Sequence, residues 1–113
     1  MKTIKNSISV DELKIMTKKM FDNLVKAVVD IKKEIMTVDA PMHSDEEAEL
    51  IKNGSKQENL WGINLYPAKK GKDFIEFDSI INIRPNQNNR SRDVDDPKIR
   101  KIIIKIVNKL VQK

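Results

Sequence analysis

The chain has 113 residues, contains no cysteine, and carries a formal net charge of +5 from 22 Lys and Arg against 17 Asp and Glu. This length fits one domain and is too short for two, so we expect residues 1–113 to form a single domain in which 1–8 are a loose tail. The absence of cysteine excludes disulfides, thiolate metal sites and cysteine nucleophiles. Because the chain has neither a signal-like segment nor an apolar run of about 18 residues, we expect a cytoplasmic protein without a membrane span.

A capping box marks the first helix. Ser9 lies three residues before Glu12, so its hydroxyl can accept the Glu12 backbone amide and start a helix at Val10. Apolar residues then recur at helical spacing as far as residue 24. Asp22 and Asn23 offer a place for the helix to end, because Asn tolerates a left-handed turn better than most residues.

Residues 25–38 permit two interpretations. Alternating apolar residues, many of them β-branched, favour a strand that begins at Val25 and runs toward Val38. A helical stripe through the same segment would instead extend the first helix, and it comprises Leu24, Val28, Ile31, Ile35 and Val38. We favour the strand because β-branched residues are enriched in strands.

The middle of the chain predicts a turn, a short helix and a hairpin. Residues 39–41 (Asp-Ala-Pro) are typical of a turn, and residues 44–47 (Ser-Asp-Glu-Glu) begin a short acidic helix that ends at Asn53 and Gly54. Residues 60–66 and 74–84 each alternate apolar and polar side chains, which predicts two strands. The segment 67–72 joins these strands as a hairpin turn.

The last part of the chain predicts a polar loop followed by a helix. Residues 85–96 contain no periodic apolar residue, and Asp96 followed by Pro97 is typical of a helix start. The whole pattern predicts an α+β fold. We expect a small antiparallel sheet of about three main strands, an N-terminal and a C-terminal helix packed on one face, and the short acidic helix in between.

The polar side chains of the predicted strands should share one sheet face. Side chains alternate between the two faces of a strand, so the polar members of each run point the same way. They are Asp30, Lys32, Asn64, Tyr66, Glu76, Asp78, Asn82 and Arg84. A solvated face is the ordinary outcome for a small sheet, but Asn, Tyr, Asp and Arg make directed hydrogen bonds. We therefore expect ligand-binding residues on this face, and the candidates are Asn64, Tyr66, Asn82 and Arg84.

The polar loop adds Arg90 and Arg92 to the ligand-binding candidates. A guanidinium group binds carboxylate or phosphate through two parallel hydrogen bonds. Three Asp residues follow at positions 93, 95 and 96. A turn that pairs its own Arg and Asp residues is therefore the alternative to an anion site.

The single histidine provides the catalytic alternative. His43 precedes Asp45, and Asp30 would come near it if the strand folds back at residue 39. One histidine with carboxylates could bind Mg²⁺ or Mn²⁺, or could orient a general base, so His43, Asp30, Asp45 and Asp78 are the catalytic candidates. Nitrogen and sulfur ligands are too few for a zinc site, and the residues specify no metal or cofactor.

Three classes of function remain open, because the chain contains no phosphate-cradling glycine loop, nucleophile elbow or HExxH motif. The first hypothesis is a small binding or regulatory module that recognises a protein partner or an anionic ligand through the polar face and the Arg-containing loop. The alternative is a small hydrolase-type or metal-assisted enzyme built around His43. A nucleic-acid-binding domain is a further alternative, and it is less favoured because acidic blocks interrupt the basic ends of the chain.

Several strings of this sequence resemble a known family. They include VKAVVDI at residues 25–31, GSKQENLWGINLYP at 54–67, and INIRP at 81–85, with NRS at 89–91 and DPKIR at 96–100 following. The chain resembles the family of short bacterial and archaeal proteins called domain of unknown function 5674, over roughly residues 19–112. That family tends to have two glycines where this chain has Asp39 and Ala40. The resemblance implies a self-contained domain and no particular activity.

Overall fold

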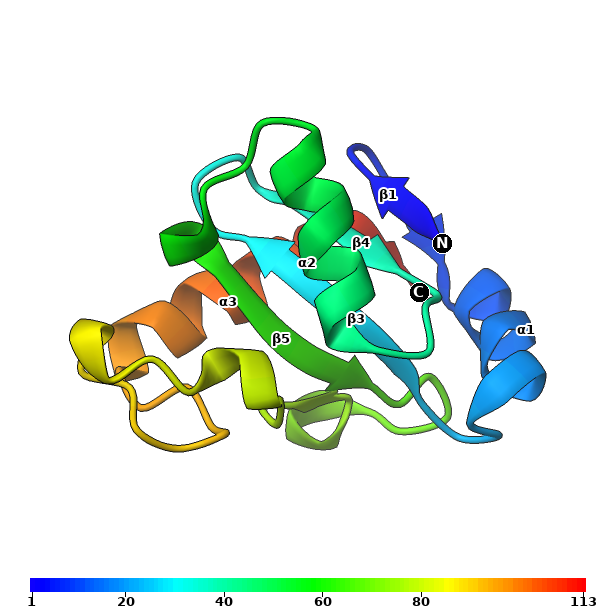
Figure 1. Ribbon diagram of the computed structural model, residues 1–113. Helices are drawn as coiled ribbons and strands as arrows, with labels where there is room; N and C mark the ends of the chain where they lie inside the picture. The colour runs from blue at the N-terminus through cyan, green and yellow to red at the C-terminus, as the bar shows by residue number, and fades with distance from the viewer.

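A computed structural model describes residues 1–113 and contains a five-stranded antiparallel sheet in the order β1-β4-β3-β5-β6 (Figure 1). The strands are β1 (Lys2–Ile4), β3 (Val25–Asp30), β4 (Ile35–Val38), β5 (Leu60–Leu65) and β6 (Ile75–Glu76), and the helices are α1 (Val10–Met20), α2 (His43–Lys52) and α3 (Pro97–Leu110). A smaller sheet pairs β2 (Ile8–Ser9) with β7 (Val111–Gln112) in parallel. The predicted α+β class with an antiparallel sheet is confirmed, and the expected number of about three main strands was too low.

The predicted helix boundaries follow from local capping. Ser9 Oγ accepts the Glu12 backbone amide at 3.0 Å and starts α1 at Val10, as the capping box predicts. The Asp96 side chain accepts the amide of Lys98 at 2.9 Å and caps α3, which begins at Pro97. None of the helices has the length and apolar character that a membrane span requires.

The segment 25–38 is a hairpin, which corrects both interpretations of its sequence. β3 and β4 pair antiparallel, and the turn at residues 31–34 reverses the chain between them. Asp30 Oδ1 accepts the backbone amides of Lys32 and Lys33, both at 2.9 Å, and Glu34 has a left-handed backbone with φ 57°. The side chain of Asp30 therefore stabilises a turn where we expected the strand, or alternatively the helix, to continue.

Residues 2–4 and 8–9 form strands, where a loose tail was expected for 1–8. β1 pairs with β4 at the edge of the main sheet, where Lys2 lies opposite Val38 and Ile4 opposite Met36. Ile8 lies opposite Val111 in the smaller sheet. Ile4 and Ile8 are both buried, and their burial in the core holds this segment in place.

The second alternating run forms only a short strand. β6 ends at Glu76, and the chain then leaves the sheet through a 3₁₀ turn at Ile80–Asn82. The Asn82 side chain replaces a neighbouring strand, because its Oδ1 accepts the Gly62 amide at 2.8 Å and its Nδ2 donates to the Gly62 carbonyl at 2.9 Å. The predicted strand over 74–84 is therefore wrong beyond Glu76. Ile81 packs on the sheet face opposite to the one that carries Trp61.

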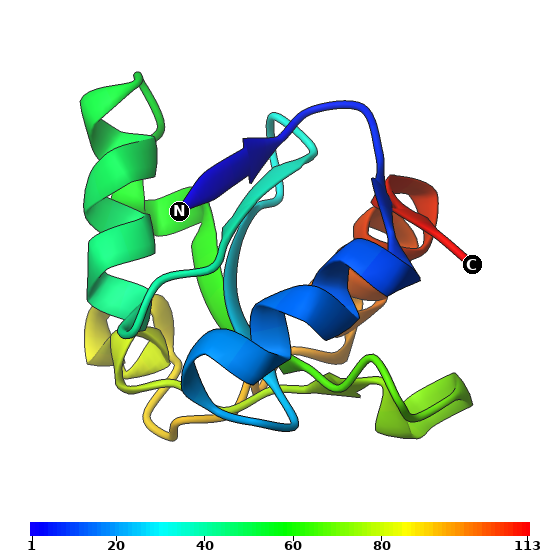
Figure 2. The ribbon, with the colours of Figure 1, turned by 90° about the vertical axis from the view of Figure 1, so that its right-hand side faces the viewer.

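Helices cover both faces of the sheet. Figure 2 shows the sheet nearly edge-on, with α1 and α3 on one side and α2 on the other. The main core lies under α1 and α3 and includes Trp61, which is 1% exposed. A smaller core of Val28, Leu50 and Leu60 lies under α2. The polar face predicted from the sequence is therefore largely covered by α2 rather than open to solvent.

Gly62 occupies a position where β5 and the 3₁₀ turn approach closely. A Cβ atom at residue 62 would lie 2.6 Å from both Cβ and Oγ of Ser79, and Ser79 is 1% exposed. We expect Gly62→Ala to lower the free energy of unfolding by about 1–3 kcal/mol, because the clash is with an anchored side chain. Urea unfolding of Gly62→Ala, Ser79→Gly and the double variant measures this effect. The double variant should recover part of the loss, and purely additive losses would contradict the proposed clash.

Candidate functional site

His43 lies at the start of α2, between that helix and β5. It is 7% exposed, and its Nε2 lies 2.8 Å from the carbonyl oxygen of Ile63. Since a carbonyl only accepts, Nε2 carries the proton and Nδ1 is the acceptor nitrogen of the neutral ring. Burial lowers the pKa of His43, the charge of Lys26 lowers it further, and the hydrogen bond to Ile63 opposes both. His43 is therefore neutral at pH 7.

A small pocket opens beside His43, and we call it the α2 pocket. Its volume is about 180 Å³, and its lining residues are Lys26, Met42, His43, Ser44, Ser79, Ile80, Ile81 and Arg92. They come from β3, the start of α2, the 3₁₀ turn and the polar loop, which are four segments far apart in the sequence. Two cationic side chains and two hydroxyl groups therefore line one small space.

Of the two cationic side chains at the α2 pocket, one has a carboxylate partner and the other has none. Arg92 Nε donates to Asp78 Oδ1 at 2.6 Å, and both side chains are partly exposed. Lys26 forms no ion pair, and its Nζ lies 5.2 Å from the centre of the Phe21 ring. α2 begins after Met42, which provides no side-chain cap for the first amides of the helix. Lys26, Arg92 and the helix start thus contribute positive charge at the pocket, which Asp45 in the first turn of α2 and Asp78 oppose.

Asn64, Tyr66 and Asp78 lie next to the α2 pocket through a hydrogen-bonded chain. Asn64 Nδ2 donates to Glu76 Oε1 at 2.8 Å and to the carbonyl of Asp78 at 3.3 Å. The Tyr66 hydroxyl donates to the same Glu76 oxygen at 2.9 Å. Burial, followed by the Glu76 carboxylate, raises the pKa of Tyr66. These side chains fix the edge of the sheet beside His43.

Arg84 has a structural position. Its Nη1 donates to the carbonyl of Gln57 and its Nη2 to the carbonyl of Leu60, while the guanidinium lies 4.3 Å from the centre of the Trp61 ring. Arg84 is 8% exposed, and burial lowers its pKa, partly opposed by the charge of Glu47. Its two terminal nitrogens are therefore occupied by backbone groups that lie away from the α2 pocket, and its buried Nε has no hydrogen-bond partner.

Asn82 and Asp30 are likewise occupied by internal contacts. Asn82 is fully buried and holds the amide and carbonyl of Gly62, as described above. Asp30 Oδ2 accepts the Ser55 hydroxyl at 2.7 Å, and its other oxygen caps the turn after β3. Asn82 thus joins the 3₁₀ turn to β5, Asp30 stabilises the turn after β3, and neither side chain lines the α2 pocket.

The polar loop is held together largely by its own residues. Asn89 Nδ2 donates to the carbonyls of Asn82, Ser91 and Asp93, and its Oδ1 accepts the amide of Asp95 at 2.8 Å. The Ser91 hydroxyl donates to Asp95 at 2.6 Å and lowers the pKa of that carboxyl. Arg90 is exposed and contributes only its backbone amide to this network. Of the two Arg residues predicted here, Arg92 reaches a pocket.

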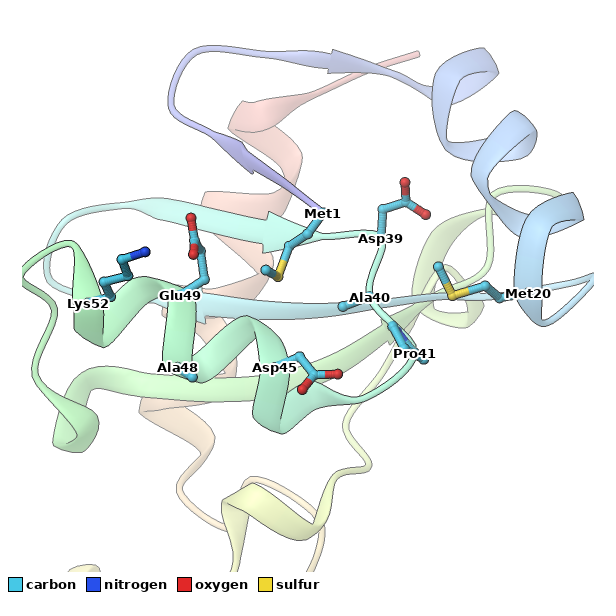
Figure 3. Close-up of a pocket in the computed structure, with 9 residues that line it drawn as sticks. All are labelled: Met1, Met20, Asp39, Ala40, Pro41, Asp45, Ala48, Glu49 and Lys52. Carbon is cyan, nitrogen blue, oxygen red and sulfur yellow. The ribbon is translucent and has the colours of Figure 1, made fainter.

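Asp45 lies in a different hollow, between α2 and the chain that follows β4. Figure 3 shows Asp45 and Glu49 on α2, with Met1 beside Glu49 and with Asp39 and Pro41 on the connecting segment. This shallow hollow has a volume of about 570 Å³. Asp39 already pairs with Lys19 at 2.7 Å. No group of three or more His, Asp or Glu side chains in the chain is arranged to hold a metal ion.

Glu46 is an acid whose side chain lies on the buried side of α2. It is fully buried, its Oε2 accepts the Ala40 amide at 3.1 Å, and its Oε1 has no hydrogen-bond partner. Burial raises its pKa to about 10, so Glu46 is protonated at neutral pH. His43, Glu46 and Leu50 form the buried side of α2. Their helical spacing was the sequence signal that could have indicated the burial of Glu46.

A family model described as Protein of unknown function (DUF5674) matches residues 2–110, which is nearly the whole chain. The chain belongs to this family. No curated protein and no solved structure matches it. The DUF5674 resemblance inferred from the sequence strings is thus confirmed.

In this DUF5674 protein, the predicted site residues divide into two groups. Two of them line the α2 pocket, His43 and Arg92, and three lie next to it, Asn64, Tyr66 and Asp78. The other five lie away from the pocket, namely Asp30, Asp45, Asn82, Arg84 and Arg90. Sequence reasoning missed Lys26, Ser44 and Ser79 at the α2 pocket, because Lys and Ser residues without a motif carry no distinctive signal.

Proposed function

We propose that this protein is a small binding module whose α2 pocket holds an anionic group of the size of phosphate. The observation that carries the proposal is the convergence of Lys26, Arg92 and two serine hydroxyls on one pocket at the uncapped start of a helix. Each of these groups can donate a hydrogen bond to an anion. A volume of about 180 Å³ suits a compact anionic group better than a large organic ligand.

The electrostatics favour an anion over a cation or a neutral ligand. Lys26 is partly buried and has no carboxylate partner, so an anion would supply the missing countercharge. The positive end of the α2 dipole and its free amides add to the attraction. Asp78 opposes it, but that carboxylate is already paired with Arg92. Arg92 has its two terminal nitrogens left for a ligand.

The pKa of His43 should change when an anion occupies the α2 pocket. An anion beside the ring would favour the protonated imidazolium, so the pKa of His43 should rise when the anion binds. By linkage, binding should be tighter below the pKa of His43 in the free protein than above it. A residue that senses the ligand in this way is consistent with a regulatory module.

The test is a titration of the full chain with inorganic phosphate, followed by two-dimensional amide NMR at pH 7. We expect saturable shifts at residues 43–46 and 79–81, and a higher pKa of His43 in the phosphate-bound protein. Lys26→Met should weaken binding by roughly tenfold, because it removes a charged donor while keeping the length of the side chain.

Lys18→Met provides the matched control, because Lys18 is an exposed lysine on α1 that forms no ion pair. This variant should bind phosphate like the wild type. If phosphate shifts neither set of amides, or if both lysine variants bind equally well, the α2 pocket is not an anion site.

A further inference from the structure

A second cleft lies on the other side of the sheet, between β6 and α3, and we call it the β6–α3 cleft. Its volume is about 590 Å³, which is within the range of small-molecule sites. Phe74, Phe77 and Ile104 contribute apolar surface, and Lys72, Arg100 and Lys113 contribute positive charge. No acidic side chain lines it. No residue of the cleft belongs to the α2 pocket.

The apolar wall combines fixed and exposed surface. Phe74 is 3% exposed and belongs to the main core, so its ring is held in place by packing. Phe77 is partly buried against the same core. Ile104 projects from α3 and is 39% exposed, although large apolar side chains are more often buried. A ligand that covers Ile104 would therefore remove apolar surface from water.

Of the three cationic side chains of the β6–α3 cleft, one is paired with a carboxylate and two are not. Arg100 donates to Asp93 Oδ2 and to the carbonyl of Val94, both at 2.7 Å, and its guanidinium lies 5.3 Å from the centre of the Phe77 ring. Arg100 thus belongs to the wall, with its charge largely neutralised. Lys72 and Lys113 form no ion pair, and Lys113 Nζ lies 5.3 Å from the centre of the Phe74 ring. Their charges are available to a ligand.

We propose that the β6–α3 cleft binds a small amphipathic anion, with one carboxylate attached to an aromatic or branched aliphatic body. The apolar body would pack on Phe77 and Ile104, and the carboxylate would lie between Lys72 and Lys113. Charge complementarity selects an anion, since these two lysines have no countercharge in the protein. An added peptide strand fits less well, because β6 has only two residues and offers few backbone groups for pairing.

Amide NMR of the full chain with 4-phenylbutyrate tests this proposal. We expect saturable shifts at residues 72–77, 100–104 and 113. Two analogues separate the contributions: 4-phenylbutanol lacks the charge and butyrate lacks the ring. Each should bind at least tenfold more weakly than 4-phenylbutyrate. Equal binding of 4-phenylbutanol would overturn the role of the lysines, and equal binding of butyrate would overturn the role of the apolar wall.

Substitutions of residues that line the cleft provide a second test of the proposal. The double variant Lys72→Glu/Lys113→Glu should weaken 4-phenylbutyrate binding by about tenfold, since both changes reverse an exposed charge. Ile104→Trp should weaken it by filling the cleft. Lys105→Glu is the control, because Lys105 is exposed on α3 and does not line the cleft. The proposal fails if the double variant retains wild-type affinity, if Lys105→Glu weakens binding as much as the double variant does, or if 4-phenylbutyrate causes no saturable shift.

Binding of phosphate at the α2 pocket is tested separately and can fail without affecting this result. Lys26→Met should leave 4-phenylbutyrate binding unchanged, because Lys26 lines only the α2 pocket of these two sites. Phosphate should likewise bind the Lys72→Glu/Lys113→Glu variant normally. A loss of 4-phenylbutyrate binding in Lys26→Met would place this ligand at the α2 pocket and overturn the assignment to the cleft.

Discussion

Replacing Glu46 by Gln is expected to raise the free energy of unfolding at pH 7 by on the order of 3 kcal/mol. In the folded chain Glu46 is fully buried and protonated, with a pKa raised from 4.5 to about 10. In the unfolded chain it ionises near its ordinary pKa. Folding at neutral pH therefore requires uptake of a proton. Gln has nearly the same shape as the protonated acid and can still accept the Ala40 amide, but it needs no proton.

The difference in unfolding free energy between Glu46→Gln and the wild type should depend on pH. Between about pH 4.5 and pH 10 the folded state binds more protons at Glu46 than the unfolded state, so the stability of the wild type falls as the pH rises. His43 acts in the opposite direction, because its lowered pKa makes its contribution decrease as the pH falls below about 6.5. Subtracting the wild-type curve from that of Glu46→Gln cancels the His43 contribution. Urea unfolding at pH 5, 7 and 9 should show a difference that grows with pH.

Glu58→Gln is the control for this experiment, because Glu58 is an exposed glutamate. It should change the unfolding free energy by no more than about 0.5 kcal/mol at any of the three pH values. A Glu46→Gln protein less stable than the wild type at pH 9 would show that Glu46 is ionised in the fold.

Replacing Arg84 by Met is expected to cost on the order of 3–5 kcal/mol of stability. The change removes two charge-assisted hydrogen bonds, to the carbonyls of Gln57 and Leu60, and the stacking on Trp61. Arg84→Lys should recover only part of the loss, because an ammonium group cannot reproduce the planar fork that spans both carbonyls. Thermal unfolding followed by far-UV circular dichroism measures both variants.

Arg90→Met is the matched control, since Arg90 is an exposed arginine of the same loop region whose side chain forms no hydrogen bond or ion pair. Its unfolding temperature should stay close to that of the wild type. An Arg84→Met protein that melts like the wild type would mean that Arg84 is free for a ligand, as its position in the sequence first suggested.

The starts of α1 and α3 and the inward face of β5 could be predicted from the sequence. Ser9 and Asp96 each accept an amide of the helix that they begin, and such capping depends on only a few neighbouring residues. The alternation in β5 correctly placed Trp61 in the core, because one face of this strand packs against α1 and α3. Short-range chemistry was sufficient in these cases.

Hydrogen bonds from side chains to the backbone of distant segments could not be predicted in this way. Asn82 pairs with Gly62 across 20 residues, and Arg84 bridges to Leu60 across 24 residues. Both side chains looked like ligand-binding groups because their partners are backbone atoms that the sequence does not identify. The placement of α2 over the polar face was missed for a related reason, since Glu46 on its buried side looks like a solvated acid.

The parallel pairing of β2 with β7 constrains the order in which the chain can fold. Ile8 and Val111 are neighbours in space but are separated by about a hundred residues, so closing this contact carries a large loop entropy. During synthesis, the segment before α1 has to wait for its partner until the end of α3 has left the ribosome. Pairing of β2 with β7 therefore belongs to the last stage of folding, after the hairpin of β3 and β4 can already have formed.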